Sequence, residues 1–185
     1  EMYIIKRRNF SDGQGWMVYQ KDAIASGAAN AQSSYLTLNS NAAVVANTNR
    51  FGNVAPTTTT FGVSASSANE SGATYAAWLF ATCPGVSKVG SYTASGFART
   101  IDCGFTTGAR FVLIKRIDTT GDWWLYDSAR GITNFNDPYL FVNSTAVEVS
   151  NTNYIAPASV GFSLLATAPA GLNANGGTYI FLAIA

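Results

Sequence analysis

The chain has 185 residues, of which only 11% are charged, and its formal net charge is +1. It contains no histidine, which excludes Ser-His-Asp and Cys-His nucleophilic sites, histidine general bases and histidine metal ligands. Basic residues form no patch, so we expect no nucleic-acid partner. The apolar runs are too short to cross a membrane as helices, so we expect no membrane insertion.

The apolar segments are rich in β-branched and aromatic residues and are separated by clusters of Gly, Asn, Ser and Thr, which is typical of β-strands. In chain order, we predict strands over residues 2–6, 15–19, 34–38, 60–64, 74–80, 89–93, 99–103, 109–116, 122–126, 139–142, 161–165 and 178–184. Residues 21–30 are rich in alanine, but Gly27 limits them to one helical turn. We therefore predict an all-β protein built from antiparallel β-sandwiches of jelly-roll or lectin-like topology.

The sequence nearly repeats itself. Three segments recur 104 positions further along the chain: 39–40 as 143–144, 47–49 as 151–153, and 72–75, with one substitution, as 176–179. A constant offset predicts two related units in tandem. Pro84 and Gly85 break the strand before them, so we place the first unit at residues 1–83 and the second at 84–185.

The first unit has no counterpart of the predicted strands 89–93 and 99–103, which surround a turn at Gly96 in the second unit. We interpret the first unit as lacking its N-terminal strands, with Glu1 inside a domain of a longer or processed polypeptide. Loss of these strands during evolution is the alternative.

Aromatic residues supply the candidate binding site. Trp123, Trp124 and Tyr126 form the densest aromatic cluster, and Trp16 and Tyr19 occupy the matching positions in the first unit. Exposed aromatic rings stack on sugars, which makes these five residues candidate glycan or subunit-interface contacts, although core packing is the favoured alternative. Successive strand residues face opposite sides, so we expect one of Trp123 and Trp124 to be buried and the other partly exposed.

No two acidic residues stand out in the sequence as a catalytic pair. Asp127, which begins the segment 127–131, is predicted to fix a turn rather than to act as a catalytic acid or calcium ligand, because the neighbouring acids are scattered. The clusters at 6–8 and 115–116 end apolar strands. Such charges most often keep a sheet edge from pairing, and binding to an acidic polysaccharide is the alternative.

The two cysteines, Cys83 and Cys103, are too few for a zinc cluster. Buried free thiols are the favoured interpretation, and a single disulfide is the alternative if the two Cα atoms lie within about 7 Å. We therefore expect no catalytic residue, no metal and no cofactor.

Residues 89–93, 101–105, 109–116 and 123–131, followed by 143–145, 161–162 and 176–180, resemble a domain of tail-fibre and other tail-associated proteins of tailed bacteriophages. The resemblance covers about residues 86–185, and it reaches residues 1–81 more loosely through the repeat. It implies a concanavalin-like β-sandwich related in shape to lectin and SPRY-type domains. Its motifs are structural, so it transfers no functional residue to a numbered position.

The same resemblance implies a function. We expect a non-enzymatic structural or adhesive tail component that is assembled in the host cytoplasm and exposed to the medium on the virion. Its partners would be other virion proteins and copies of itself, most often as a trimer, with a host surface polysaccharide as candidate ligand. The alternatives are a virion-associated polysaccharide-degrading enzyme and a capsid-attached head fibre or decoration protein.

Overall fold

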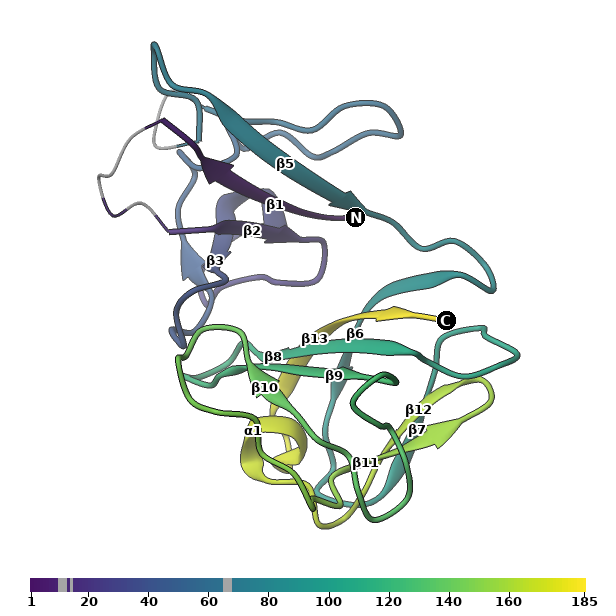
Figure 1. Ribbon diagram of the computed structural model, residues 1–185. Coiled ribbons are helices and arrows are strands. Elements are labelled where there is room, and N and C mark those ends of the chain that lie inside the picture. Colours follow the sequence, from purple (N-terminus) through teal and green to yellow (C-terminus); the bar gives the residue numbers. More distant parts are fainter. Residues whose placement is uncertain (10–12, 14, 65–67) are drawn as a thin grey trace. The chain divides into compact units, whose positions relative to one another are not determined.

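The computed structural model describes residues 1–9, 13, 15–64 and 68–185 (Figure 1). This part of the chain is almost entirely β-structure in antiparallel sheets, which confirms the predicted all-β fold class. No helix within it is long and apolar enough to cross a membrane. The chain divides into two compact units, residues 1–80 with 117–120 and residues 81–116 with 121–185.

The first unit contains one five-stranded sheet with the strand order β4-β3-β2-β1-β5. Its elements are β1 (Met2–Arg7), β2 (Met17–Gln20), η1 (Ala31–Ser33), β3 (Ser34–Thr37), β4 (Val45–Ala46) and β5 (Tyr75–Phe80). Residues of β1 and β2 that pair directly share a face of the sheet, so Tyr3 lies beside Tyr19 and Ile5 beside Met17. The rings of Tyr3 and Tyr19 stack at 4.7 Å, and all four side chains belong to the core of this unit.

The second unit contains a five-stranded sheet, β10-β9-β8-β13-β6, and a three-stranded sheet, β11-β12-β7. Its elements are β6 (Ser87–Thr93), β7 (Arg99–Asp102), β8 (Phe111–Arg116), β9 (Trp123–Asp127), β10 (Leu140–Phe141), β11 (Ile155–Ala158), β12 (Gly161–Leu164), α1 (Ala170–Asn173) and β13 (Thr178–Ile184). The two sheets share one buried core, in which Phe162 of β12 meets Phe181 of β13 edge to face at 5.6 Å. Two sheets that face each other across such a core form a sandwich.

The central strands of the two units have the same order and register. β3-β2-β1-β5 in the first unit corresponds to β10-β9-β8-β13 in the second. Arg7 lies opposite Tyr75 on the neighbouring strand, and Arg116 lies opposite Tyr179. Trp16, directly before β2, also corresponds to Trp123, the first residue of β9, since the two are held in the same way, as described next. These matches support the tandem interpretation, which stays a prediction.

The repeated asparagines hold equivalent hydrogen bonds. The side-chain oxygen of Asn39 accepts from the backbone N–H of Trp16 at 2.8 Å, and that of Asn143 accepts from Trp123 at 2.7 Å. Asn143 also donates to Asp122 at 2.8 Å. Each asparagine therefore ties the end of one strand to the start of its neighbour.

Several local predictions were wrong. Residues 60–64 form no strand, although Phe61 and Val63 pack on the core, because no strand among the described residues pairs with their backbone. The short strands β4 and β11 and the helix α1 were not predicted. Residues 21–30 form turns, and the helical turn follows them as η1, where Asn30 accepts from the Ser33 N–H at 3.0 Å.

The predicted role of the strand-end cations in protecting sheet edges was also wrong. β1 and β8 are both central strands with a neighbour on each side. Arg7 is buried and forms an ion pair with Glu70 at 2.6 Å, and Lys115 is buried and donates to the carbonyls of Arg116 and Gly121 at 2.8 Å. Arg7 and Lys115 are thus buried cations that are paired with an acceptor, and they guard no sheet edge.

The two asparagine hydrogen bonds differ in burial, so we expect their loss to lower the free energy of unfolding by different amounts. Asn143→Ala leaves a partly buried N–H without its acceptor and should lower the free energy of unfolding by about 1–3 kcal/mol. Asn39→Ala leaves the Trp16 N–H free to bond with water, so it should lower the free energy of unfolding by less than about 1 kcal/mol. Urea denaturation measures both, with the exposed Asn175→Ala as the matched control. An Asn143→Ala variant as stable as this control would contradict the assigned role.

Candidate functional site

The aromatic residues singled out from the sequence are mostly core residues. Trp123 and Trp124 are 1% and 6% exposed, and Tyr126 and Tyr19 are buried as well, so of the five only Trp16 reaches the surface in part. The expectation that one of Trp123 and Trp124 is exposed was therefore wrong. The two side chains do point to opposite faces of β9, but both faces are covered.

Trp124 shows how tightly this cluster is packed. Its ring lies 4.5 Å from Tyr139 and 4.7 Å from Phe141, measured between ring centroids. A Cβ atom added at Gly171 would lie 2.8 Å from the Trp124 Nε1, so only glycine fits there. A ligand could reach this indole only after the core had opened.

A second aromatic pair lies at the surface of the first unit. The rings of Trp16 and Trp78 stack at 5.2 Å with an interplanar angle of 24°, and Trp78 is 43% exposed. Trp78 pairs with Ile4 of β1, and Trp16 comes directly before Met17, the partner of Ile5. Directly paired residues share a face, so the two indoles lie on the same face of the sheet, on either side of β1.

Sequence reasoning identified Trp16 and missed Trp78. Trp78 lies within an uninterrupted apolar run, which indicates a buried strand, yet β5 is an edge strand. Asn39 accepts from the Trp16 backbone N–H, and the Trp16 indole stacks on Trp78. The pair presents an apolar, rigid surface of the kind that stacks on a sugar ring.

The turn after β9 matches its prediction. The Asp127 carboxylate accepts from the Arg130 N–H at 2.9 Å and pairs with the Arg130 guanidinium, which also lies 2.8 Å from Glu148. Asp127 and Arg130 border a shallow recess beside Arg110. Asp127 is thus a turn-fixing residue, and its ion pair occupies the carboxylate that a catalytic role would need.

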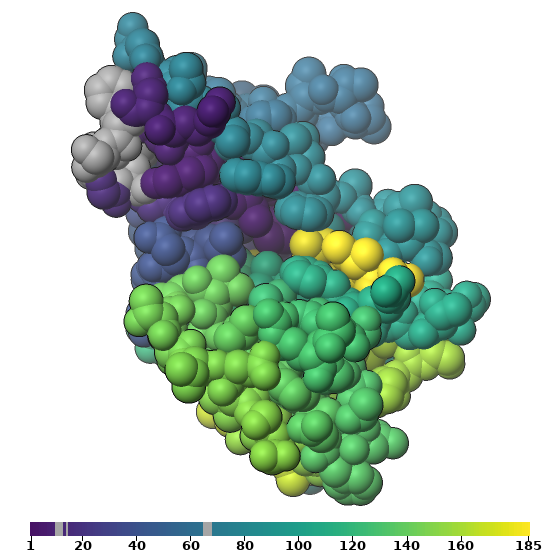
Figure 2. Space-filling view, viewed as in Figure 1, coloured from purple at the N-terminus to yellow at the C-terminus, as the bar shows by residue number. Residues whose placement is uncertain are grey.

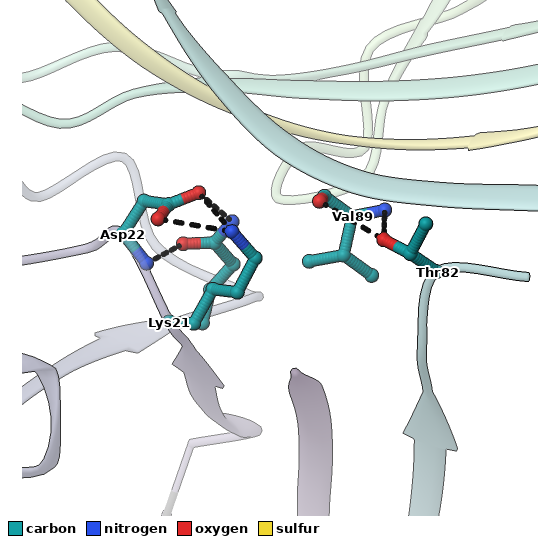
Figure 3. A network of polar contacts seen from close by, with 5 residues as sticks. Lys21, Asp22, Thr82 and Val89 are labelled. Carbon is teal, nitrogen blue, oxygen red and sulfur yellow. Dashed lines mark hydrogen bonds and ion pairs between the residues drawn. The ribbon is translucent and has the colours of Figure 1, made fainter. Parts of the chain in front are cut away.

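The first unit closes the corresponding turn differently (Figure 3). The Gln20 side-chain oxygen accepts from the Asp22 N–H at 2.6 Å, and the Lys21 ammonium lies 3.1 Å from the Asp22 carboxylate. Within the second unit, Figure 3 also shows the Thr82 hydroxyl accepting from the backbone N–H of Val89 at 3.3 Å. These contacts satisfy turn and strand backbones and leave no group aimed at a ligand.

A buried carboxylate lies in the second unit. Asp137 is fully buried, and one of its oxygens accepts from the N–H groups of Tyr154 and Ile155 at 3.0 and 2.8 Å. Its other oxygen and the Tyr126 hydroxyl have no hydrogen-bond partner in the described part of the chain. Burial raises the pKa of Asp137 and outweighs the hydrogen bonds that favour the carboxylate. Asp137 fastens the start of β11, and it is remote from solvent.

The cysteines are both free thiols. Cys103 is buried, as expected, whereas Cys83 is exposed. Burial raises the pKa of the Cys103 thiol to about 11, so it is uncharged and unreactive at neutral pH. Across the described residues, no three His, Cys, Asp or Glu side chains gather as a metal site would require.

The chain belongs to DUF7483, a family described as a domain of unknown function, whose family model matches residues 1–185. Neither a curated protein nor a solved structure matches it. What this domain does must therefore be inferred from its own residues and their geometry.

The buried Asp137 predicts an unusual pH dependence of stability. Because its pKa is higher in the folded protein than in the unfolded chain, its stabilising contribution is present below the unfolded pKa and is lost as the pH rises through the folded pKa. Asp137→Asn carries no charge, so its stability relative to the parent should increase as the pH rises above the ordinary carboxyl pKa of about 4. Thermal unfolding across this range measures the difference.

The exposed Asp102→Asn, in the same unit, controls for the change in net charge. A stability difference between Asp137→Asn and the parent that stays constant with pH would contradict the assignment.

Proposed function

We propose that this member of the DUF7483 family is a non-enzymatic structural and adhesive component of a bacteriophage tail, and that its first unit contacts a host surface glycan. The observation that carries the proposal is the surface pair Trp16–Trp78. The resemblance of residues 86–185 to tail-associated domains supports the virion setting. The all-β fold and the low content of charged residues suit a packed extracellular assembly.

The geometry of the pair suits a sugar ring. Trp16 covers one side of the Trp78 indole, and 43% of Trp78 remains accessible. An aromatic face packs well against the C–H face of a pyranose because both are flat and apolar.

The proposal includes assembly with other virion proteins and with copies of the chain, as a trimer. Large apolar side chains that are exposed in the second unit support such contacts: Phe97, Phe135 and Val147. Exposed apolar residues of this size are common in surfaces that pack against partners.

A glycan array of bacterial surface polysaccharides should identify a ligand for the purified chain. Trp78→Ala should weaken binding to that ligand by tenfold or more, which corresponds to about 1.4 kcal/mol. Fluorescence titration measures the affinity, and circular dichroism checks the fold, which should be unchanged because Trp78 is already half exposed.

The matched control is Ile24→Ala, which removes an exposed apolar side chain from the same unit outside the tryptophan pair. It should bind like the parent. Absence of any ligand on the array, or equal binding by Trp78→Ala and the parent, would contradict the glycan-contact proposal. New reducing ends released from the bound polysaccharide would instead identify the alternative, a degrading enzyme.

A further inference from the structure

The loop between β9 and β10 carries a phenylalanine in an unusual backbone conformation. Thr133 and Asn136 exchange backbone hydrogen bonds of 3.3 Å, so Asn134 and Phe135 form the tip of a tight turn. Phe135 has a φ of 69°, in the left-handed region that turns usually assign to glycine or asparagine. It is 78% exposed, so burial of the ring does not compensate for the strained backbone.

Side-chain hydrogen bonds hold this strained turn in place. The Asn153 side-chain oxygen accepts from the Phe135 N–H at 3.2 Å. The Asn136 side-chain oxygen accepts from the Asn151 N–H at 3.1 Å. The Thr133 hydroxyl donates to the Asn136 carbonyl at 2.6 Å. These bonds fix a phenyl ring in water, and strained residues that are fixed by their surroundings occur most often at functional sites.

The base of the turn is anchored in the core of the second unit. The next residue, Asp137, is the buried carboxylate that accepts from the N–H groups of Tyr154 and Ile155. The buried Thr152 hydroxyl donates to the Asp137 carbonyl at 2.7 Å. Figure 2 shows the green part of the chain, around residues 130–150, at the surface of the second unit. The exposed turn is therefore tied to a rigid support.

Amide groups lie beside the exposed ring. Because the side-chain oxygens of Asn136 and Asn153 accept from backbone N–H groups, their NH2 groups are left as donors. Neither NH2 group has a hydrogen-bond partner among the described residues. Asn134 and Asn151, which flank them in sequence, are exposed as well. The ring of Phe135 is thus accompanied by amides from its own turn and from the neighbouring segment.

This combination of groups suits an uncharged saccharide. A phenyl ring packs on the C–H face of a pyranose, and amide NH2 groups donate to its oxygen atoms. Residues 133–136 and 151–154 contain no charge, so they lack the cations that bind nucleic-acid phosphates or the carboxylates of acidic sugars. An apolar protein surface would bury the amides without giving them partners, which is unfavourable.

The first unit does not repeat this arrangement. There the side-chain oxygen of Asn47, the counterpart of Asn151, accepts from the Asn49 N–H at 2.8 Å. This segment therefore bonds within itself, whereas in the second unit Asn153 bonds to the turn that carries Phe135. The connection between β2 and β3 also contains no aromatic residue. The arrangement belongs to the second unit alone and is separate from the tryptophan pair.

We propose that Phe135 and the side-chain amides of Asn136 and Asn153 form a binding site for an uncharged saccharide on the second unit. The phenyl ring packs against one face of a pyranose, and the two NH2 groups donate to its oxygen atoms. Asp137 is a positioning residue, because it anchors the turn from within the core. The site requires neither the tryptophan pair nor the virion setting. A second copy of the chain, packed on the exposed ring, is the competing occupant.

Nuclear magnetic resonance of the ¹⁵N-labelled 185-residue chain tests the proposal. The probes are neutral oligosaccharides of glucose, galactose, mannose, rhamnose or N-acetylglucosamine, with an alginate oligosaccharide as the acidic control. At least one neutral probe should give saturable shifts of the Phe135 backbone signal and of the Asn136 and Asn153 NH2 signals. Absence of such shifts with every neutral probe, or equal shifts with alginate, would overturn the proposal.

Variants show which groups bind the probe. Phe135→Gly removes the ring and fits the left-handed backbone, so it should weaken binding by about tenfold or more with the turn intact. Phe135→Trp should keep the affinity. Asn153→Asp retains the oxygen that accepts from the Phe135 N–H but lacks the NH2 donor, so it should also weaken binding by about tenfold. The matched control, Phe97→Ala, removes another exposed ring of the same unit and should bind like the parent.

Two further outcomes separate this site from the alternatives. Trp78→Ala should bind the probe like the parent, whatever it does to the glycan contact of the first unit. Loss of binding by Trp78→Ala, or parent-like binding by Phe135→Gly, would overturn the proposal. Light scattering that shows an oligomer of the parent and a monomer of Phe135→Gly would overturn it too, because a second copy would then cover the ring.

Discussion

Backbone pairing at the outer edge of the last strand determines how completely each unit buries its core. β13 has β6 on that edge, and its inward side chains are all buried. Among the described residues no strand pairs with that edge of β5, and Leu79 is 62% exposed although its side chain lies on the core side of the sheet. The second unit also has the three-stranded sheet β11-β12-β7 across its core, which makes it a sandwich, whereas the described strands of the first unit form one sheet.

The proposed glycan contact depends on the edge position of β5. Trp78 reaches the surface because β5 lies at the edge of its sheet, and Trp16, held by Asn39, supports it from across β1. In the second unit the corresponding tryptophan, Trp123, is buried and cannot serve a ligand. The matched strands of the two units thus have the same order and register, and the accessible tryptophan pair lies in the first unit.

The sequence predicted the central strands well because their apolar runs are long and have unmistakable strand composition. Burial on both faces of β9 was not predictable from the sequence. The alternation of side chains along a strand shows which residues share a face, but it does not show whether another part of the protein covers that face. The two-residue strand β4 has too few residues to show a pattern. Residues 155–158 were not predicted as a strand because they contain Pro157, and proline is uncommon within strands. Trp78 was missed because the sequence pattern of an apolar run does not distinguish a central strand from an uncovered edge strand.

Amide hydrogen exchange along β5 tests the open edge most directly, because exchange requires the N–H to be free of a partner. In the purified chain the account predicts alternation: fast exchange at Tyr75, Ala77 and Leu79, and slow exchange at Ala76 and Trp78, whose N–H groups face β1 in the antiparallel ladder. The counterparts in β13 should all be protected: Tyr179, Phe181 and Ala183. Uniform protection along β5 would contradict the account, because it would show that this edge is already paired.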